Sequence, residues 1–210
     1  MTAISKHEET RQKLIEVAGQ IFAEVGYEAA TVRQITDRAQ VNVAAVNYYF
    51  GDKSQLYRAV LQSVTGRALH LLESHCTHGS PEVRLRQFVR CVLFLESDDN
   101  YAWAHLLMAR ESMELHDTQP VVVVEMIRPI HNIAEDIVRD VLGSDCVPAR
   151  VKLASSLVVS LCFSRLPQHR LDQRLYPEIS SHEIDIETIT ESVYRFALAG
   201  IHGLSKSDFP

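Results

Sequence analysis

The chain has 210 residues, of which 46% are hydrophobic, and its formal net charge is −6. This length allows a substantial buried core, and the negative charge excludes a protein that binds nucleic acid through a general basic field. No uninterrupted apolar run reaches the length of a membrane span and the N-terminus lacks a signal-peptide layout, so we expect a cytoplasmic protein without a membrane partner.

The first predicted element is an amphipathic helix over residues 8–25. Leu14, Ile21 and Val25 are among the apolar residues that recur at helical spacing along it. Gly26 is expected to stop this helix, because glycine adopts the left-handed conformation that ends helices at little steric cost. Residues 1–7 are polar and are expected to be mobile.

The stretch 31–53 contains two short helical patterns separated by a few residues. Ile35 and Ala39 share one face of the first helix, which Thr31 can cap, and Asn42 can cap the second. Two helices joined by a short turn are typical of the helix-turn-helix motif, in which the second helix enters a major groove of DNA.

The charge of this region limits how it can bind DNA. Up to Lys53 the chain has six Lys and Arg residues against seven Asp and Glu residues. A nearly neutral segment provides no basic field. We therefore expect DNA contacts from a few individually placed side chains.

The remainder of the chain is also predicted to be helical. Pro129 is expected to kink or break its helix, because proline removes one hydrogen bond and clashes with the preceding turn. Residues 167–184 lack a sustained period and are expected to form an irregular loop. We find no convincing strand, so the prediction is an all-α fold of about nine helices. The further helices are expected at 52–76, 81–95, 102–116, 119–142, 151–166 and 186–202.

The cysteines and histidines carry no metal signature. No CxxC pair is present, so neither a zinc knuckle nor a secreted disulfide framework is indicated, and reduced, buried thiols are expected. His70, His75 and His78 lack the i, i+4 spacing of a helix-borne metal pair, and we expect no metal and no cofactor. A redox-responsive regulator acting through the cysteines is the alternative. The four cysteines are Cys76, Cys91, Cys146 and Cys162.

Residues 11–57, RQKLIEVAGQIFAEVGYEAATVRQITDRAQVNVAAVNYYFGDKSQLY, resemble the tetracycline-repressor (TetR) family of bacterial transcription regulators in order and spacing. The resemblance implies a three-helix DNA-binding head over residues 1–55. It also implies a larger helical body over residues 56–210 that binds a small molecule and dimerises. The stretches WAHLLMARE and MIRPIHNI look similar to the C-terminal domain of the CerR-like branch.

The resemblance also implies which residues meet DNA. The recognition helix should be residues 42–48, with Asn42, Val43, Ala44 and Asn47 nearest the bases. Tyr48, Tyr49 and Lys53 should contact phosphates, together with Thr31 and Arg33 from the preceding helix. Phe50 is expected to be a core residue. Gln40 stands where glycine is common, so the turn either avoids a positive φ or tolerates strain of about 1 kcal/mol. The predicted DNA-binding residues are Thr31, Arg33, Asn42, Val43, Ala44, Asn47, Tyr48, Tyr49 and Lys53.

A body of this kind needs a cavity with an apolar lining and a few polar anchors. Arg110 and Glu111 are candidate anchors, although each could equally be tied into separate structural bonds. The ligand is an unidentified small-molecule effector. The predicted ligand-binding residues are Phe88, Trp103, Met108, Arg110, Glu111, Met126, His131 and Phe163.

The expected function is a ligand-responsive homodimeric repressor that binds a near-palindromic double-stranded operator and is released by its effector. Small and apolar positions in the last two helices, Ala154, Ser155, Ala197 and Gly200, are expected to build the dimer interface as a four-helix bundle.

No enzymatic activity is expected, because no motif of nucleophile and base is present. The alternative from another class is an all-α enzyme with a vestigial head. It would use Glu111 with His105 or His131 as acid and base.

Overall fold

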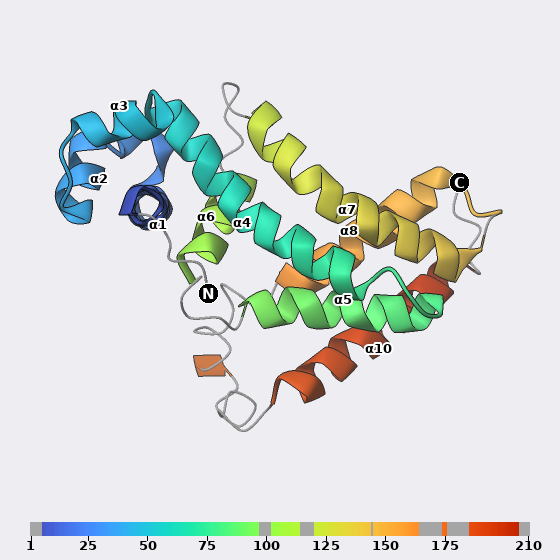
Figure 1. The fold of residues 1–210 in the computed structure, drawn as a ribbon. Coiled ribbons are helices and arrows are strands. Elements are labelled where there is room, and N and C mark those ends of the chain that lie inside the picture. Colours follow the sequence, from blue (N-terminus) through green and yellow to red (C-terminus); the bar gives the residue numbers. More distant parts are fainter. Residues whose placement is uncertain are drawn as a thin grey trace. The chain divides into compact units, whose positions relative to one another are not determined.

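The structure is a computed structural model that describes residues 6–96, 102–113, 120–143, 145–163, 174–175 and 185–205. Within these ranges every long element is an α-helix and there is no strand, which confirms the predicted all-α fold (Figure 1). The long helices are α1 (Lys6–Ala29), α2 (Val32–Ala39), α3 (Ala44–Phe50), α4 (Lys53–His75), α5 (Pro81–Glu96), α6 (Ala102–Met113), α7 (Pro120–Leu142), α8 (Pro148–Phe163) and α10 (Ile186–Ser205).

The chain divides into two compact units. Unit 1 consists of Met1–Gly66 and Asn100–Met126, and unit 2 consists of Arg67–Asp99 and Ile127–Pro210. Unit 1 therefore contains α6 as well as the helix-turn-helix. The division of the chain at residue 55 stays a prediction.

The core of unit 1 forms where α1 packs against α2 and α6, and α2 against α3. Leu14, Phe22, Ile35 and Val46 are fully buried there. Gly26 interrupts the helical geometry of α1, with φ 81° and ψ 165°, as the sequence predicted. A last turn then extends α1 to Ala29.

The core of unit 2 is built by α5, α8 and α10, which pack against one another, together with the last part of α7. Phe88, Ile137 and Ile201 are fully buried in it. Ion pairs lie along the contact between α5 and α10, where Arg86 reaches Glu187 at 3.3 Å and Glu191 at 3.1 Å.

Pro129 lies inside α7, where the sequence predicted a kink or a break. The break is wrong, because α7 is one helix on both sides of this residue, and the kink stays a prediction. Burial of Ile130, Ile137 and Val138 on the following turns compensates for the lost hydrogen bond, since tertiary packing contributes most of the stability of protein helices. The predicted loop 167–184 lies almost entirely outside the described residues.

None of the helices in the described part of the chain is long and apolar enough to cross a membrane.

Candidate nucleic-acid interface

The start of α2 is fixed by a reciprocal capping arrangement. The Thr31 hydroxyl accepts a hydrogen bond from the Gln34 backbone N–H at 3.2 Å, and the Gln34 side-chain oxygen accepts one from the Thr31 N–H at 2.9 Å. Two N–H groups that the helix itself cannot pair are thereby satisfied. Thr31 is the predicted cap, and this role is confirmed.

The turn between α2 and α3 passes through Gln40 in the left-handed conformation, with φ 56° and ψ 45°. The Gln40 N–H donates to the Asp37 carbonyl at 3.2 Å, and the Val41 N–H donates to the Thr36 carbonyl at 3.0 Å. These two bonds close the end of α2 as a glycine would. Of the two alternatives left open by the sequence, the turn therefore adopts the positive φ and tolerates the strain, about 1 kcal/mol.

The helix α3 begins at Ala44, two residues after the predicted start, and continues to Phe50 rather than Tyr48. The Asn42 side-chain oxygen accepts a hydrogen bond from the Ala44 N–H at 2.8 Å. The N-cap of α3 is Val43, without a side-chain cap bond, so the predicted cap at Asn42 is wrong. Asparagine favours such local turns over helical geometry, and Asn42 lies in the turn before the helix.

The side chains of α3 and of the two residues before it divide into a buried and an exposed set. Val46 is fully buried, whereas Asn42, Val43, Ala44 and Asn47 are exposed. Tyr48 exposes 73% of its surface, and Tyr49 and the predicted core residue Phe50 are half-buried. The residues predicted to lie nearest the bases therefore point away from the core. Their contacts with DNA stay predictions.

Lys53 has a position that the sequence did not indicate. Its ammonium donates to the carbonyls of Tyr27 at 2.8 Å and Ala30 at 2.9 Å, with Glu28 O at 3.5 Å. It also lies 4.3 Å from the centroid of the Tyr27 ring. Lys53 thus closes the end of α1. These partners lie 23 to 26 residues away in the sequence, beyond any local pattern.

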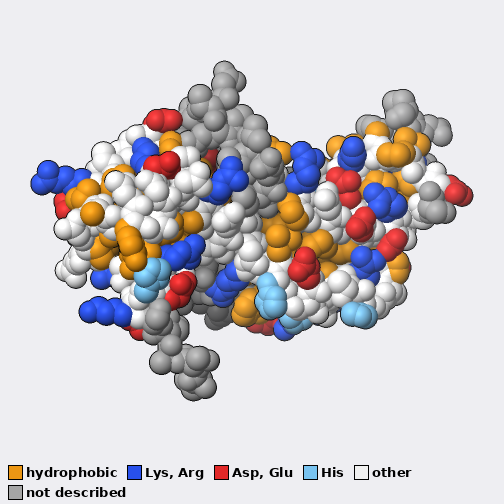
Figure 2. All heavy atoms as spheres, turned by 45° about the horizontal axis from the view of Figure 1, so that its top comes forward, with side chains coloured by type: hydrophobic (Ala, Val, Ile, Leu, Met, Phe, Trp, Pro, Cys, Tyr) orange, Lys and Arg blue, Asp and Glu red, His pale blue; other side chains and the backbone are white. Residues whose placement is uncertain are grey.

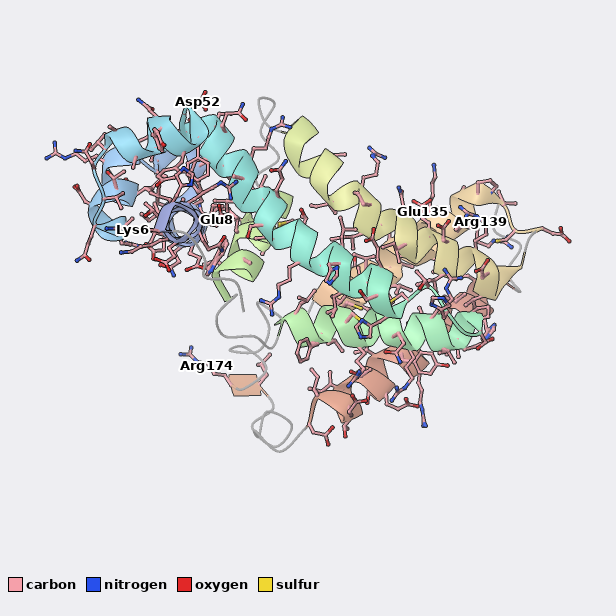
Figure 3. All side chains as sticks on the ribbon, in the orientation of Figure 1. Lys6, Glu8, Asp52, Glu135, Arg139 and Arg174 are labelled. Carbon is pink, nitrogen blue, oxygen red and sulfur yellow. The ribbon has the colours of Figure 1, made fainter. Side chains whose placement is uncertain are left out.

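A ring cluster connects the beginning of α1 with the end of α3. The His7 ring centroid lies 4.7 Å from that of Tyr49 and 5.8 Å from that of Tyr48, and the two tyrosine rings are 5.0 Å apart. Figure 3 shows Lys6 and Glu8 on the same first turn of α1. The expectation that residues 1–7 are mobile is wrong for Lys6 and His7, which belong to α1; residues 1–5 lie outside the description.

The charges of the head are dispersed. The Arg33 guanidinium lies 3.7 Å from the Asp37 carboxylate, and Arg38 reaches Glu24 at 2.8 Å. On the face drawn in Figure 2, the Lys and Arg side chains of the described residues are scattered among Asp and Glu. This distribution agrees with the nearly neutral sequence of the region.

Two predicted ligand-binding residues of α6 contact other parts of unit 1. A Cβ atom on Gly19 of α1 would lie only 2.2 Å from the Trp103 ring, so this ring lies directly on the helix backbone. Arg110 donates to the Glu24 carbonyl at 3.5 Å, which is the structural alternative that the sequence left open for this residue. Burial, and to a smaller extent the carboxylate of Glu111, raises the pKa of Tyr57, but the Tyr57 hydroxyl has no hydrogen-bond partner among the described residues. Neither alternative is decided for Glu111.

The other predicted ligand-binding residues belong partly to unit 1 and partly to unit 2. Phe88 is fully buried in the core of unit 2, and His131 is half-buried, with a pKa that burial lowers against the opposing effect of the Glu135 carboxylate. Met108 is half-buried in α6. The side chains of Met126, Phe163 and His105 lie outside the described residues.

The cysteines are free, as expected, and three of them, Cys76, Cys91 and Cys162, are buried. Among the described residues no three His, Cys, Asp or Glu side chains are arranged to hold a metal ion.

Comparisons with known families agree with this geometry. Residues 14–60 match the profile described as bacterial regulatory proteins of the tetR family. Residues 81–201 match the C-terminal domain of the helix-turn-helix transcriptional dual regulator CecR. This match corrects the CerR-like branch expected from the sequence to that of CecR.

Individual relatives include the dual regulator CecR of Shigella flexneri, which is 27% identical over 167 residues that cover 73% of this chain and 74% of CecR. The transcriptional repressor AcnR of Corynebacterium efficiens is 32% identical over 94 residues. That match covers 45% of each protein, and the chain thus spans less than half the length of AcnR.

Solved structures share the fold. The fatty acid degradation regulator FadR of Bacillus halodurans superimposes with a TM-score of 0.69 at 17% identity, over 95% of this chain and 98% of that one. FadR of Bacillus subtilis, solved in complex with stearoyl-CoA, gives 0.68 at 18% identity, over 91% and 99% of the two chains. Since the CecR profile covers 121 of the 210 residues and the tetR profile covers the helix-turn-helix, the chain belongs to the TetR family of transcription regulators, in the branch with a CecR-type C-terminal domain.

Proposed function

We propose that this regulator is a homodimeric repressor that binds a near-palindromic operator and is released by a small-molecule effector. The observation that carries the proposal is the division of side chains in α3 and the turn before it. Val46 is buried, whereas Asn42 of the turn and Ala44, Asn47 and Tyr48 of α3 are exposed to solvent. A short helix with small and polar exposed side chains fits a major groove closely.

Each exposed group has a chemical counterpart on DNA. The Asn47 amide can pair with adenine through two hydrogen bonds, and the absence of a long side chain at Ala44 allows close approach to the bases. The Tyr48 hydroxyl and the guanidinium of Arg33 suit phosphate oxygens. Because the head is nearly neutral, these few contacts carry the binding.

Exposed apolar residues support the dimer. Leu153 and Leu157 lie one turn apart on α8, and Leu157 exposes 49% of its surface. Phe196, with 69% exposed, lies one turn before Gly200 on α10, which packs against α8. We define Leu153, Leu157, Phe196 and Gly200 as the α8–α10 patch. A second copy that offers the same patch across a two-fold axis would cover it.

The α8–α10 patch differs from the dimer contacts expected from the sequence. Ala154, Ser155 and Ala197 are buried inside unit 2, so their expected place in the interface is wrong. Their small size serves the close packing of the unit's own helices. Of the four expected interface residues, only Gly200 is accessible to a partner, since a Cβ atom added there would have no neighbour within 4 Å.

The relatives support repression and effector release. AcnR is a transcriptional repressor, and the structure of FadR from Bacillus subtilis contains stearoyl-CoA. For this chain the effector would act by binding preferentially to the form with low operator affinity. Phe88 and His131 in unit 2 are the predicted lining residues that we retain for the first tests, because Trp103 and Arg110 already have partners in unit 1.

Titration of the purified chain against the DNA upstream of its own gene tests the proposal. We expect a protected, near-palindromic site whose affinity falls as salt rises. Protection that is absent both there and in genome-wide sequencing of bound fragments would rule the proposal out. The double variant Asn47→Ala, Tyr48→Ala is the control, because its exposed substitutions should abolish specific protection and leave the fold intact.

A further inference from the structure

The helix α3 is short and buries little of its own surface. It has seven residues, all of which the structure describes, and Val46 is the one buried side chain among them. Helices of this length are marginal on their own, so the position of α3 depends on contacts with other elements. A residue that fixes the end of α3 therefore also fixes the groups that this end presents to DNA.

Two residues of α1 contact the aromatic end of α3, which consists of Tyr48, Tyr49 and Phe50. The His7 ring centroid lies 4.7 Å from that of Tyr49, with the ring planes at 61°, and 5.8 Å from that of Tyr48, with the planes at 72°. The guanidinium carbon of Arg11 lies 5.5 Å from the centroid of the Phe50 ring. Residues at i and i+4 share one face of a helix, so His7 and Arg11 form a single contact surface on the first turns of α1.

The rings are arranged as in attractive aromatic contacts. Edge-to-face pairs with centroids roughly 4.5–7 Å apart place the positive edge of one ring on the negative face of another. The two tyrosines also meet in this way, with centroids 5.0 Å apart and planes at 87°. His7 thus completes a cluster of three rings. Tyr48 still exposes 73% of its surface, so the cluster restrains this side chain and leaves it accessible to a partner.

The turn that carries the imidazole is itself held in place within α1. The Thr10 hydroxyl donates to the Lys6 carbonyl at 2.9 Å, and the Arg11 guanidinium lies 3.7 Å from the Glu8 carboxylate. The following turns of α1 are anchored in the core of unit 1, where Leu14 is fully buried. The ring contact therefore connects the exposed end of α3 to this core.

We propose that His7 is a positioning residue for operator binding, whose ring holds Tyr48 and Tyr49 in the conformation in which they meet the DNA backbone. This role rests on the proposed function, since it takes the two tyrosines as phosphate contacts. Side chains that are ordered before binding lose less conformational entropy when the partner binds. His7 acts through the tyrosines and need not contact DNA itself.

The test measures the affinity of the full chain for the DNA fragment that the wild-type chain protects. Fluorescence anisotropy at low salt keeps weakened variants measurable. We expect His7→Ala to weaken binding about two- to tenfold, which corresponds to the cost of ordering one side chain. His7→Phe should bind like the wild type, because phenylalanine restores a ring without the two nitrogens. A direct bond from the imidazole to a phosphate would instead be lost in both variants.

A double-mutant cycle shows whether His7 acts through the tyrosines. In a chain that already carries Tyr48→Ala and Tyr49→Ala, His7→Ala should cause no further loss of affinity, because its partners are gone. Gln20→Ala is the matched control, since Gln20 is an exposed, neutral residue of the same helix, and it should bind like the wild type. Urea denaturation should give similar stabilities for His7→Ala and Gln20→Ala, because both side chains are exposed.

Three outcomes would overturn the proposal. They are equal affinities of His7→Ala and the wild type, equal losses in His7→Phe and His7→Ala, and an undiminished loss from His7→Ala in the chain without the two tyrosines. The first two are measured at an exposed position, so they decide the question even if the tyrosine variant folds poorly. If the proposed function fails, the wild-type chain itself protects no DNA. If only the role of His7 fails, wild-type protection remains, so the two failures are distinguishable.

Discussion

The α3 helix of unit 1 and the α8–α10 patch of unit 2 both expose side chains, but these side chains differ in chemistry. In α3 the exposed residues are small or polar, such as Asn47 and Tyr48, above a single buried Val46. In the α8–α10 patch they are large and apolar, such as Leu157 and Phe196. The contrast indicates that α3 is suited to a polar, charged polymer and the patch to a second protein surface.

A charged substitution in the α8–α10 patch should have the largest effect, on both dimerisation and operator affinity. We expect Leu157→Glu to convert the dimer to a monomer, because burying an unpaired carboxylate in an apolar interface is costly. Operator affinity should fall about 100-fold or more as the second head is lost. Sedimentation velocity and fluorescence anisotropy measure the two effects.

Val83→Glu on α5 is the matched control, since Val83 exposes 48% of its surface, almost as much as Leu157. It should change neither assembly nor affinity. If Leu157→Glu remained dimeric, the α8–α10 patch would not be the dimer interface. The contrast between a DNA-binding α3 and a protein-binding patch would then be wrong.

Disturbing the packing of α6 on α1 should have the next largest effect, on the free energy of unfolding. In Gly19→Ala the new methyl group would lie 2.2 Å from the Trp103 ring, so this ring or the helix must shift. We expect a loss of about 1–3 kcal/mol in the free energy of unfolding, the usual range for overpacking. Urea denaturation followed by circular dichroism measures it.

Gly66→Ala in α4 has no atom within 4 Å of the new methyl group. It should instead stabilise the chain by about 0.5–1 kcal/mol, because alanine favours the helix. Equal stability changes in the two variants would show that Trp103 does not lie on α1.

A smaller effect is expected for base reading by α3. Asn47→Ala should remove about 1 kcal/mol or more of discrimination at one operator base pair and leave other positions unaffected. Competition assays with single-base operator variants measure it. Tyr48→Phe is the comparison, because loss of a phosphate contact should weaken all operator variants alike, by about 1 kcal/mol. If Asn47→Ala weakened binding to all operator variants equally, Asn47 would contact phosphates and not a base.

The smallest change concerns the turn before α3. Gln40→Gly should stabilise unit 1 by about 0.5–1 kcal/mol, because glycine adopts φ 56° without the clash of a Cβ atom. Gln40→Asn should give a smaller gain. Thermal unfolding measures both. A loss of stability in Gln40→Gly would mean that the glutamine side chain compensates for its own strain.

The sequence predicted those features that depend on neighbouring residues. Thr31 and Asp52 cap the helices that they precede, Pro81 starts α5, and Gly26 interrupts α1. In each case the hydrogen bond or the backbone preference acts within four residues, so the pattern contains the cause.

The remaining features depend on packing between distant segments. The Trp103 ring on Gly19 and the ammonium of Lys53 on the carbonyl of Tyr27 join residues that are far apart in the sequence. A helical period shows that Ala154 and Leu157 lie near one another on α8. It does not show which of the two is buried in the core of unit 2. Whether the predicted ligand-binding residues meet at one site depends on such distant packing as well, and their role stays a prediction.

The position of Lys53 has an electrostatic consequence for the head. The carbonyl end of a helix carries partial negative charge, and the last turn of α1 contains no basic residue of its own. Lys53, from the start of α4, supplies the missing cation across the fold. A polyanion that approaches this end of α1 therefore meets a helix terminus whose repulsion has already been cancelled, even though the lysine need not touch the polyanion itself.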